Sequence, residues 1–161
     1  MQLLILATLV AVVAAGQIRV GDDSSDNVEV HVIKWEVFRD AKDFDDAEKR
    51  CREERAHLVS IHSEQENQFV HSLTSTGHHI KSFEDFVYIG LRRNTRTGKW
   101  YWTDGSQVNY TKWAVHQPDH PESEHCAQLH QDPGPGLIYV EDRKWNSIPC
   151  DRPMKYFVCK R

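Results

Sequence analysis

The chain has 161 residues, and its 20 Lys and Arg against 24 Asp and Glu give a formal net charge of −4. Charges of both signs are mixed along the sequence, which excludes the basic stripe expected of a nucleic-acid-binding protein. Four cysteines can form two disulfides in an oxidising compartment, although composition alone leaves three pairings open.

The first residues indicate export. An apolar run extends from Leu3 to Ala15 and is shorter than the roughly 20 residues that a membrane-spanning helix needs. Small residues end the run, and the polar Gln17 follows. This pattern is typical of a secretory signal peptide that is cut after Ala15 or Gly16. We therefore predict a signal peptide at residues 1–16 and a secreted, extracellular protein without a membrane span.

The rest of the chain fits one domain. Residues 17–27 are acidic and rich in turn formers, which predicts a flexible N-terminal segment. Residues 28–161 have the length of a single domain and contain no internal repeat. Alternating valines near the start of this domain predict a strand at about residues 28–39.

A first amphipathic helix is predicted over residues 43–54, with Cys51 facing the core. Its inward stripe is expected to hold Phe44, Ala47, Cys51 and Arg55. Its outward face is expected to hold Asp45, Glu48, Lys49 and Arg52.

A second helix is predicted to begin at a capping box, with Ser63 as the N-cap and Glu66 three residues later. The residues expected to face inward on it are Phe69, Val70 and Leu73. The polar stretch at 74–85 contains a glycine and is predicted to be a loop.

From residue 86 the pattern changes to short strands separated by turns. Strands are predicted at 86–91, 100–102, 126–129, 137–140 and 156–159. The segment from residue 115 to about 123 has neither the periodicity of a helix nor that of a strand, so we expect a long irregular loop there.

Side chains with oxygen ligands gather in two segments that flank the cysteines, and we expect both segments to be loops. Gln117 and Asp119 lie on either side of a proline, Glu124 comes shortly after, and Asn146 and Ser147 follow much later in the chain. Carboxylate and amide oxygens are the hard ligands that Ca²⁺ prefers. The pattern therefore indicates a candidate calcium site.

These segments resemble the C-type lectin domain in its Gln-Pro-Asp variant. The segments Tyr88–Leu91, Trp100–Gly105 and Tyr156–Cys159 resemble the core, turn and closing strand of that family, in the same order. The resemblance extends over about residues 28–161. It implies an α+β fold of the short form, with two helices packed on small antiparallel sheets, a long irregular ligand loop and two disulfides.

The resemblance also implies the cysteine pairing, which is Cys51 with Cys159 and Cys126 with Cys150. In the chain-entropy model, a bridge that closes a loop of about 100 residues stabilises a domain by roughly 4–5 kcal/mol. The shorter loop would contribute roughly 3 kcal/mol.

In the family, one Ca²⁺ is held by the residues on either side of a cis proline, a downstream glutamate and an asparagine-aspartate pair. The matching residues here are Gln117, Asp119, Glu124, Asn146 and Ser147. Ser147 stands where the family has aspartate, so two carboxylates remain instead of three. Because Ca²⁺ affinity depends on ligand charge and number, we expect one weakened site. The alternative is that this loop acts without metal.

The Gln-Pro-Asp order is associated in the family with galactose-type ligands, so galactose or N-acetylgalactosamine is the expected partner. The expected sugar-binding residues are Gln117, Asp119, Glu124 and Asn146, with His120 as the only residue of the following loop that could stack on the sugar. The family's auxiliary calcium site needs acidic residues where His120 and His125 stand, so we expect that site to be absent.

Three further features have an ordinary interpretation beside a functional one. Histidines that converge can bind Zn²⁺. The histidines at 116, 120, 125 and 130 lack a helical spacing, so we interpret them as exposed loop residues and not as a zinc site. Asn109 begins a glycosylation sequon. Four tryptophans are expected in the core and not as ligand platforms, namely Trp100, Trp102, Trp113 and Trp145.

The sequence has no nucleophile-elbow, zincin or phosphate-loop motif, so no enzyme is predicted. The leading hypothesis is a secreted, Ca²⁺-dependent, galactose-type lectin in host–microbe or immune recognition. The alternative is a secreted protein-interaction module on the same fold, with a degraded or absent Ca²⁺ site. Ice or mineral binding is a third possibility that no residue favours. The sequence has no coiled-coil or collagen-like segment that would define an oligomer.

Overall fold

The computed structural model describes residues 35–39, 43–133 and 141–161. The expected signal peptide at 1–16, the flexible segment at 17–27, the first part of the strand at 28–39 and the strand at 137–140 lie outside the described residues. Within them, the first strand covers Trp35–Phe38.

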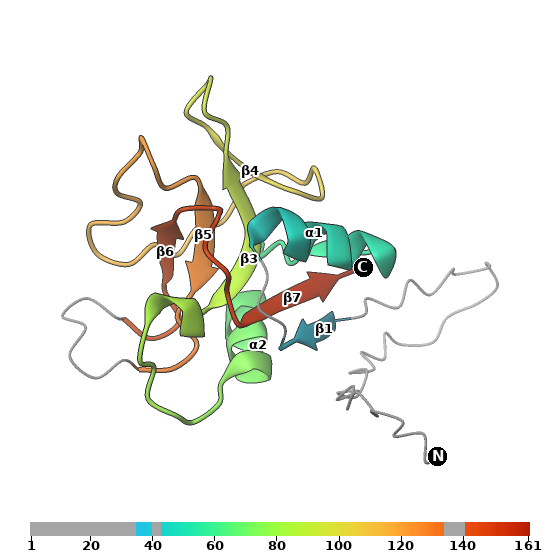
Figure 1. Ribbon diagram of the computed structural model, residues 1–161, viewed down its shortest axis with the longest axis vertical. Coiled ribbons are helices and arrows are strands. Elements are labelled where there is room, and N and C mark those ends of the chain that lie inside the picture. The colour runs from blue at the N-terminus through green and yellow to red at the C-terminus, as the bar shows by residue number, and fades with distance from the viewer. Residues whose placement is uncertain (1–34, 40–42, 134–140) are drawn as a thin grey trace, which may run out of the picture.

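Two helices and one seven-stranded sheet make up the described part of the protein (Figure 1). The helices are α1 (Phe44–Glu53) and α2 (Glu64–Thr74), and a 3₁₀ turn, η1 (Phe83–Asp85), lies between α2 and the central strand. The strands are β1 (Trp35–Phe38), β2 (His57–Leu58), β3 (Val87–Arg93), β4 (Trp100–Trp102), β5 (Cys126–Leu129), β6 (Trp145–Ile148) and β7 (Tyr156–Lys160). The α+β fold class is confirmed.

The sheet is single and mixed, where separate small antiparallel sheets were expected. Its strand order is β1-β7-β3-β5-β6, with β2 also paired to β7 and β4 to β3. Every one of these pairings is antiparallel except β3 with β7, which is parallel. Strand β3 is therefore central, and β6 lies at the sheet edge farthest from β1.

Helix α1 begins where Asp43 caps it, accepting a hydrogen bond from the Asp46 N–H at 2.8 Å. Its apolar stripe is buried as expected, but Glu48, expected outward, is buried too. The Glu48 carboxylate accepts a hydrogen bond from the Leu58 N–H at 2.9 Å and lies 2.6 Å from His57 Nδ1. It thus provides a hydrogen-bond acceptor for both residues of β2. Arg55, expected inward, is exposed because the helix has ended and Arg55 has a positive φ of 58°.

Helix α2 starts at Ser63, whose hydroxyl accepts from the Glu66 N–H at 3.1 Å. The Glu66 carboxylate turns back as in a capping box but accepts from the N–H of His62, one residue earlier than expected. Phe69, expected inward, is 40% exposed and packs edge-on against Trp35. Val70 is buried as expected, and the other buried side chains of the helix are those of Asn67 and Thr74.

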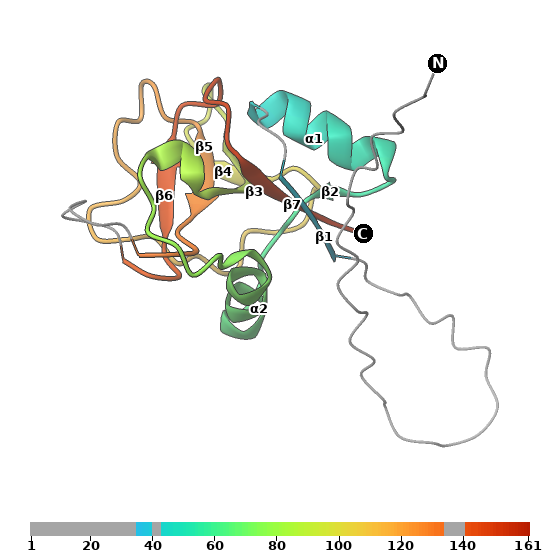
Figure 2. The same ribbon diagram turned by 60° about the horizontal axis from the view of Figure 1, so that its bottom comes forward.

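The core has two parts on opposite faces of the sheet, because alternate side chains of a strand point to opposite sides. Tyr88 belongs to the part that contains Phe44 of α1, whereas Ile89 belongs to the part that contains Val70 of α2. Trp102 and Trp145 are buried in the second part, as expected, and Trp100 and Trp113 pack against it. Figure 2 gives a second view of both helices against the sheet.

Two disulfides, with the pairing that the resemblance implies, join elements far apart in sequence. Cys51 of α1 is bonded to Cys159 of β7 across 108 residues, and Cys126 of β5 is bonded to Cys150, just after β6. The second bridge lies beside the expected ligand residues and so restrains the segment that carries them.

The segment around Asn146 was expected to be a loop and is the edge strand β6. It pairs with β5 in a register that sets Asn146 opposite Gln128. Trp145 explains why the strand is held: its indole N–H donates to Asn67 Oδ1 at 2.7 Å, and Asn67 Nδ2 donates to the carbonyl of Arg143 at 2.9 Å. One buried amide on α2 thus fixes the start of β6.

We predict that Asn67→Ala lowers the free energy of unfolding by about 1–3 kcal/mol, because it leaves the buried Trp145 N–H without an acceptor. Chemical denaturation followed by tryptophan fluorescence measures this. Gln68→Ala, a change at the exposed neighbouring position, is the control and should have little effect. Equal stability of the two variants would contradict the role given to Asn67.

Candidate functional site

The expected ligand residues meet around the side chain of Ser147. This serine is buried, and its Oγ lies 2.9 Å from Gln117 Oε1, 2.6 Å from Glu124 Oε2 and 3.3 Å from Asp119 Oδ1. Its backbone N–H also donates to Gln117 Oε1 at 3.0 Å. Four of the five residues singled out from the sequence are therefore in direct contact.

Backbone hydrogen bonds bring the loop to the strand. The Trp145 N–H donates to the carbonyl of Lys112, and the Ala114 N–H donates to the carbonyl of Trp145, both at 2.8 Å. The loop then turns at Gln117, whose peptide bond to Pro118 is cis. Gln117 and Asp119, on either side of that proline, are both hydrogen-bonded to Ser147 of β6.

A tight turn carries the second carboxylate to the same place. The Glu124 N–H donates to the carbonyl of His120 at 2.9 Å, as does the Ser123 N–H at 3.0 Å. Glu124 follows this turn directly and precedes β5, so its position depends on the sheet as well as on the loop.

The arrangement contains more hydrogen-bond acceptors than donors. Ser147 Oγ already accepts from the Asp119 N–H at 3.2 Å, and it has a single proton to donate. Four oxygen atoms lie within hydrogen-bond reach of that proton: Gln117 Oε1, Glu124 Oε2, the Asp119 carbonyl and Asp119 Oδ1. Oxygen atoms that converge with too few protons to bond them all form a set of ligand atoms that suits a hard cation.

The two carboxyl groups differ in acidity. Burial raises the pKa of Glu124, and the neighbouring Asp119 raises it further, although the hydrogen bond from Ser147 acts in the opposite direction. Burial also acts to raise the pKa of Asp119, but its hydrogen bonds with His120, Glu124 and Gln117 outweigh that effect, so its pKa lies below the usual value. Asp119 therefore stays charged more readily than Glu124.

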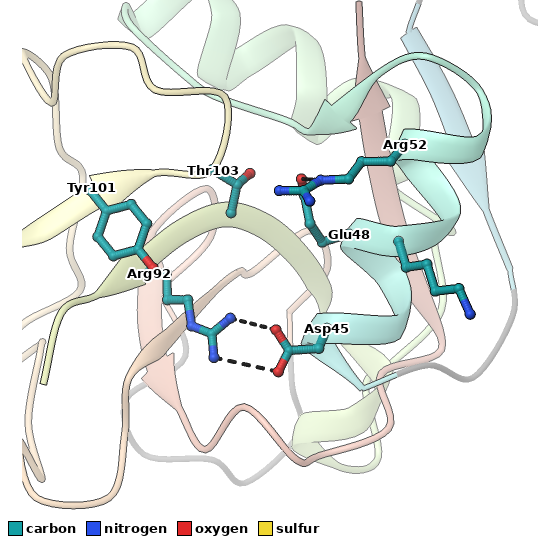
Figure 3. Close-up of a pocket in the computed structure, with 7 residues that line it drawn as sticks. Asp45, Glu48, Arg52, Arg92, Tyr101 and Thr103 are labelled. Carbon is teal, nitrogen blue, oxygen red and sulfur yellow. Dashed lines mark hydrogen bonds and ion pairs between the residues drawn. The ribbon is translucent and has the colours of Figure 1, made fainter.

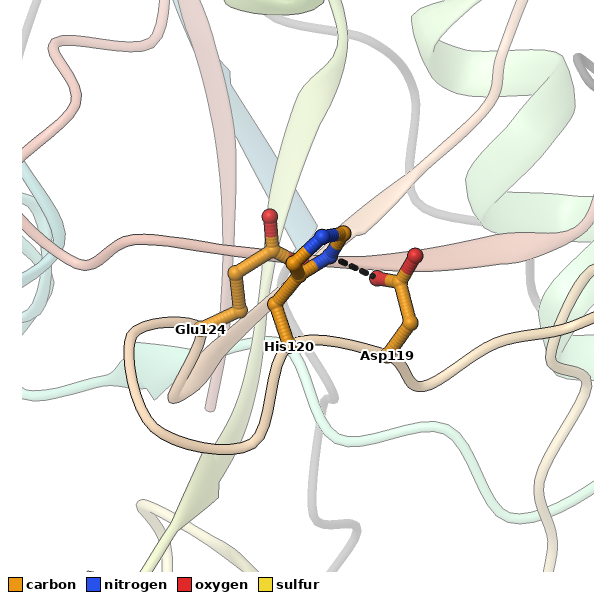
Figure 4. Close-up of side chains that lie close together, drawn as sticks. All are labelled: Asp119, His120 and Glu124. Atoms are coloured by element: carbon orange, nitrogen blue, oxygen red, sulfur yellow. Dashed lines mark ion pairs between the residues drawn. The ribbon is translucent and has the colours of Figure 1, made fainter.

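His120 lies over these carboxylates from the loop (Figure 4). Its Nδ1 is 3.1 Å from Asp119 Oδ1, and this hydrogen bond raises the pKa of His120. One ligand atom each from Asp119, His120 and Glu124 lie within 4.8 Å of one another, a span compatible with one Ca²⁺ at its usual ligand distances of about 2.3–2.6 Å. The residues present thus fit a calcium ion through their oxygens, and His120 is exposed enough to move aside.

Asn146 lies next to this group without bonding to Ser147 Oγ. Its Nδ2 donates to the backbone carbonyl of Ser147 at 2.6 Å. This orientation leaves the Asn146 Oδ1 oxygen as the atom that could act as a ligand. Asn109, the expected glycosylation site, is exposed, and its Oδ1 lies 3.0 Å from Nδ1 of His62.

The site opens into a cavity of about 460 Å³. Besides the residues already described, it is lined by Phe83, Glu84, Val115, His130, Ile148, Pro149 and Arg152. Phe83 and Arg152 do not stand out in the sequence, because both lie outside the segments that carry oxygen ligands. His130 was expected on an exposed loop and is only 2% exposed, because it continues β5 into the core beside Phe86.

A smaller cavity of about 250 Å³ lies between α1 and strands β3 and β4 (Figure 3). Its charged side chains are largely occupied with one another. Arg92 pairs with Asp45 at 2.5 Å, and Arg52 pairs with Glu48 at 3.0 Å. The Arg92–Asp45 pair ties α1 to the sheet, whereas the Arg52–Glu48 pair lies within the helix, and we assign the cavity no ligand.

Comparison with known proteins agrees with this fold, which is that of a C-type lectin-like domain. A family model described as the lectin C-type domain matches residues 40–161, and the chain therefore belongs to the C-type lectin domain family.

Two relatives and one solved structure illustrate its range. C-type lectin lectoxin-Lio1 from Erythrolamprus poecilogyrus is 37% identical over 133 residues, covering 78% of this chain and 72% of the relative. An alpha-N-acetylgalactosamine-specific lectin from Patiria pectinifera is 35% identical over 137 residues, with the same coverages. A calcium-independent type II antifreeze protein has a TM-score of 0.63 at 26% identity, covering 80% of this chain and 85% of that one.

In the part of the chain that the structure describes, no helix is long and apolar enough to cross a membrane.

We predict that His130 makes stability depend on pH. Burial lowers the pKa of His130 to about 4, from 6.5 in an unfolded chain. The unfolded state therefore binds a proton more readily between these values, and the free energy of unfolding should fall by about 3 kcal/mol as the pH drops from 6.5 to 4. Denaturation at several pH values, compared between the parent and His130→Gln, isolates this contribution.

The exposed His78→Gln change is the control and should leave the pH dependence as in the parent. An unchanged pH dependence in His130→Gln would mean that His130 is not held neutral by burial.

Proposed function

We propose that this protein is a secreted, Ca²⁺-dependent lectin of galactose type. The observation that carries the proposal is the convergence of Gln117, Asp119 and Glu124 oxygens on a single serine hydroxyl. Members of the family typically bind ligands and are not enzymes, which supports a binding role without catalysis. Host–microbe or immune recognition is the biological setting that we expect for such a lectin.

The ion would be held by side-chain oxygens of Gln117, Asp119, Glu124 and Asn146, with Ser147 as a weaker fifth ligand. When bound, Ca²⁺ supplies coordination for sugar hydroxyl groups. The two carboxylates balance its charge, and the amides of Gln117 and Asn146 can donate hydrogen bonds to the same hydroxyls. His120 lies at the rim, where its ring could contact the sugar.

Galactose or N-acetylgalactosamine is the proposed ligand. The order of an amide at Gln117 and a carboxylate at Asp119 determines which sugar hydroxyl meets a donor and which meets an acceptor. A relative described as specific for alpha-N-acetylgalactosamine, at 35% identity, supports this choice.

We propose secretion on the basis of the apolar run at residues 1–16, and two disulfides support it because they persist in oxidising compartments. Glycosylation of Asn109 is part of the same proposal, since its side chain is exposed.

A second function is a protein-interaction module that works without metal. Ser147 favours it, because a neutral hydroxyl bonded to the surrounding oxygens holds the loop in place without an ion. The similarity to a calcium-independent antifreeze protein also fits a metal-free role on this fold.

We predict that Ser147→Asp tightens Ca²⁺ binding, because it adds a charged oxygen ligand. The same change should destabilise the metal-free protein, because three carboxylates would then repel one another. Calorimetric titration and thermal unfolding with and without Ca²⁺ measure the two effects.

Ser123→Asp is the matched control: it adds the same charge on the exposed neighbouring turn and should change Ca²⁺ affinity little. If the parent binds no Ca²⁺ even at about 10⁻³ M, the weak end of the range for extracellular modules, the metal-free function is the better account.

We predict that galactose and N-acetylgalactosamine inhibit glycan binding more strongly than mannose does, and that a chelator abolishes binding. Exchanging the amide and the carboxylate in Gln117→Glu/Asp119→Asn should shift the preference toward mannose. Inhibition assays with free monosaccharides test both statements. Equal inhibition by mannose and galactose would be inconsistent with a galactose-type site.

A further inference from the structure

The cavity at the site continues past the oxygen cluster to an aromatic side chain from another part of the fold. Phe83 lines it and is 45% exposed, although it is a large apolar residue. The exposed ring is held on a defined support, since η1 is closed by Asp85, whose Oδ2 accepts from the N–H groups of Lys81 and Ser82 at 2.9 and 3.2 Å. Asp85 is in turn paired with Lys155.

The same cavity is lined by a histidine whose second nitrogen has no partner. Nδ1 of His130 lies 3.1 Å from the carbonyl oxygen of Glu141, and a carbonyl can only accept, so Nδ1 carries the proton. Nε2 is then an acceptor, and it is buried with no hydrogen-bond partner among the described residues. A buried acceptor without a donor is unfavourable, so a donor from a ligand would be favourable there.

These two features differ in chemistry from the oxygen cluster and complement a sugar ring. A pyranose has an apolar face that can lie on an aromatic ring and hydroxyl groups that can donate hydrogen bonds. The cavity, at about 460 Å³, also falls within the usual range for sites that hold ligands larger than a single small group.

We propose that Phe83 and His130 form a second saccharide subsite, which holds the sugar unit linked to the one at the Gln117–Asp119–Glu124 cluster. In this subsite the sugar stacks on the ring of Phe83 and donates a hydroxyl proton to His130 Nε2, directly or through one water. The preferred ligand is therefore a disaccharide or longer glycan. This inference rests on the proposed lectin function.

The test compares methyl galactoside with a set of galactose-terminated disaccharides of different linkages, titrated into the Ca²⁺-loaded protein. At least one disaccharide should bind about tenfold more tightly than the monosaccharide, as expected for one aromatic contact. Phe83→Ala should abolish this difference and leave monosaccharide affinity unchanged. His130→Phe, which keeps a ring beside Phe86 and removes the acceptor, should reduce it.

Tyr101→Ala is the control, because Tyr101 is similarly exposed, at 41%, but lines the other cavity. If the monosaccharide binds and no disaccharide gains affinity, or if Phe83→Ala weakens both alike, the subsite is wrong and the lectin function stands. If no saccharide binds at all, the lectin function and the subsite are both wrong.

Discussion

The pairing of β6 with β5 is the constraint on which the site depends. β6 is an edge strand of only Trp145–Ile148, and such a strand gains little stability from backbone pairing alone. It is held because the Trp145 side chain is buried and bonded to Asn67 of α2, and because the Cys126–Cys150 disulfide closes the far end of the pair. The strand then holds Asn146 and Ser147 at the same cavity, beside the loop that carries Gln117.

Ser147 gives the proposed ion site a metal-free form that needs no cation to hold it together. In a cluster with an aspartate at this position, the carboxylates would repel one another until a cation arrived. Here a small neutral hydroxyl accepts from the loop backbone and donates to one of the surrounding oxygens, so it satisfies part of the cluster. The loop can therefore hold its shape before an ion binds, at the expense of a charged ligand.

Sequence patterns predicted the elements whose signal is local. The stripe of α1, the cap at Ser63 and the strand Cys126–Leu129 each depend on neighbours in sequence, and the structure has them where expected. The errors have tertiary causes. Glu48 is buried because its carboxylate accepts a hydrogen bond from the backbone of Leu58 in β2. Phe69 is exposed because α2 turns the polar Asn67 inward.

The site itself was predictable only in part. The resemblance to a family supplied the oxygen ligands, because those residues form short motifs. Phe83 and His130 carry no such motif, and they reach the cavity only because η1 and the end of β5 are brought together by folding. The strand β6 was missed because Asn146 and Ser147 interrupt its apolar pattern.

The strand order has a consequence for how the domain can be displayed. The cavity lies beside β6 at one edge of the sheet, whereas β1 and the last strand, β7, form the opposite side (Figure 1). A surface or carrier bound beside β1 would therefore lie at the edge of the sheet opposite the cavity. Several copies held in this way could engage one glycan-rich surface together, and such multivalent contact strengthens weak single-site binding without any change in the site itself.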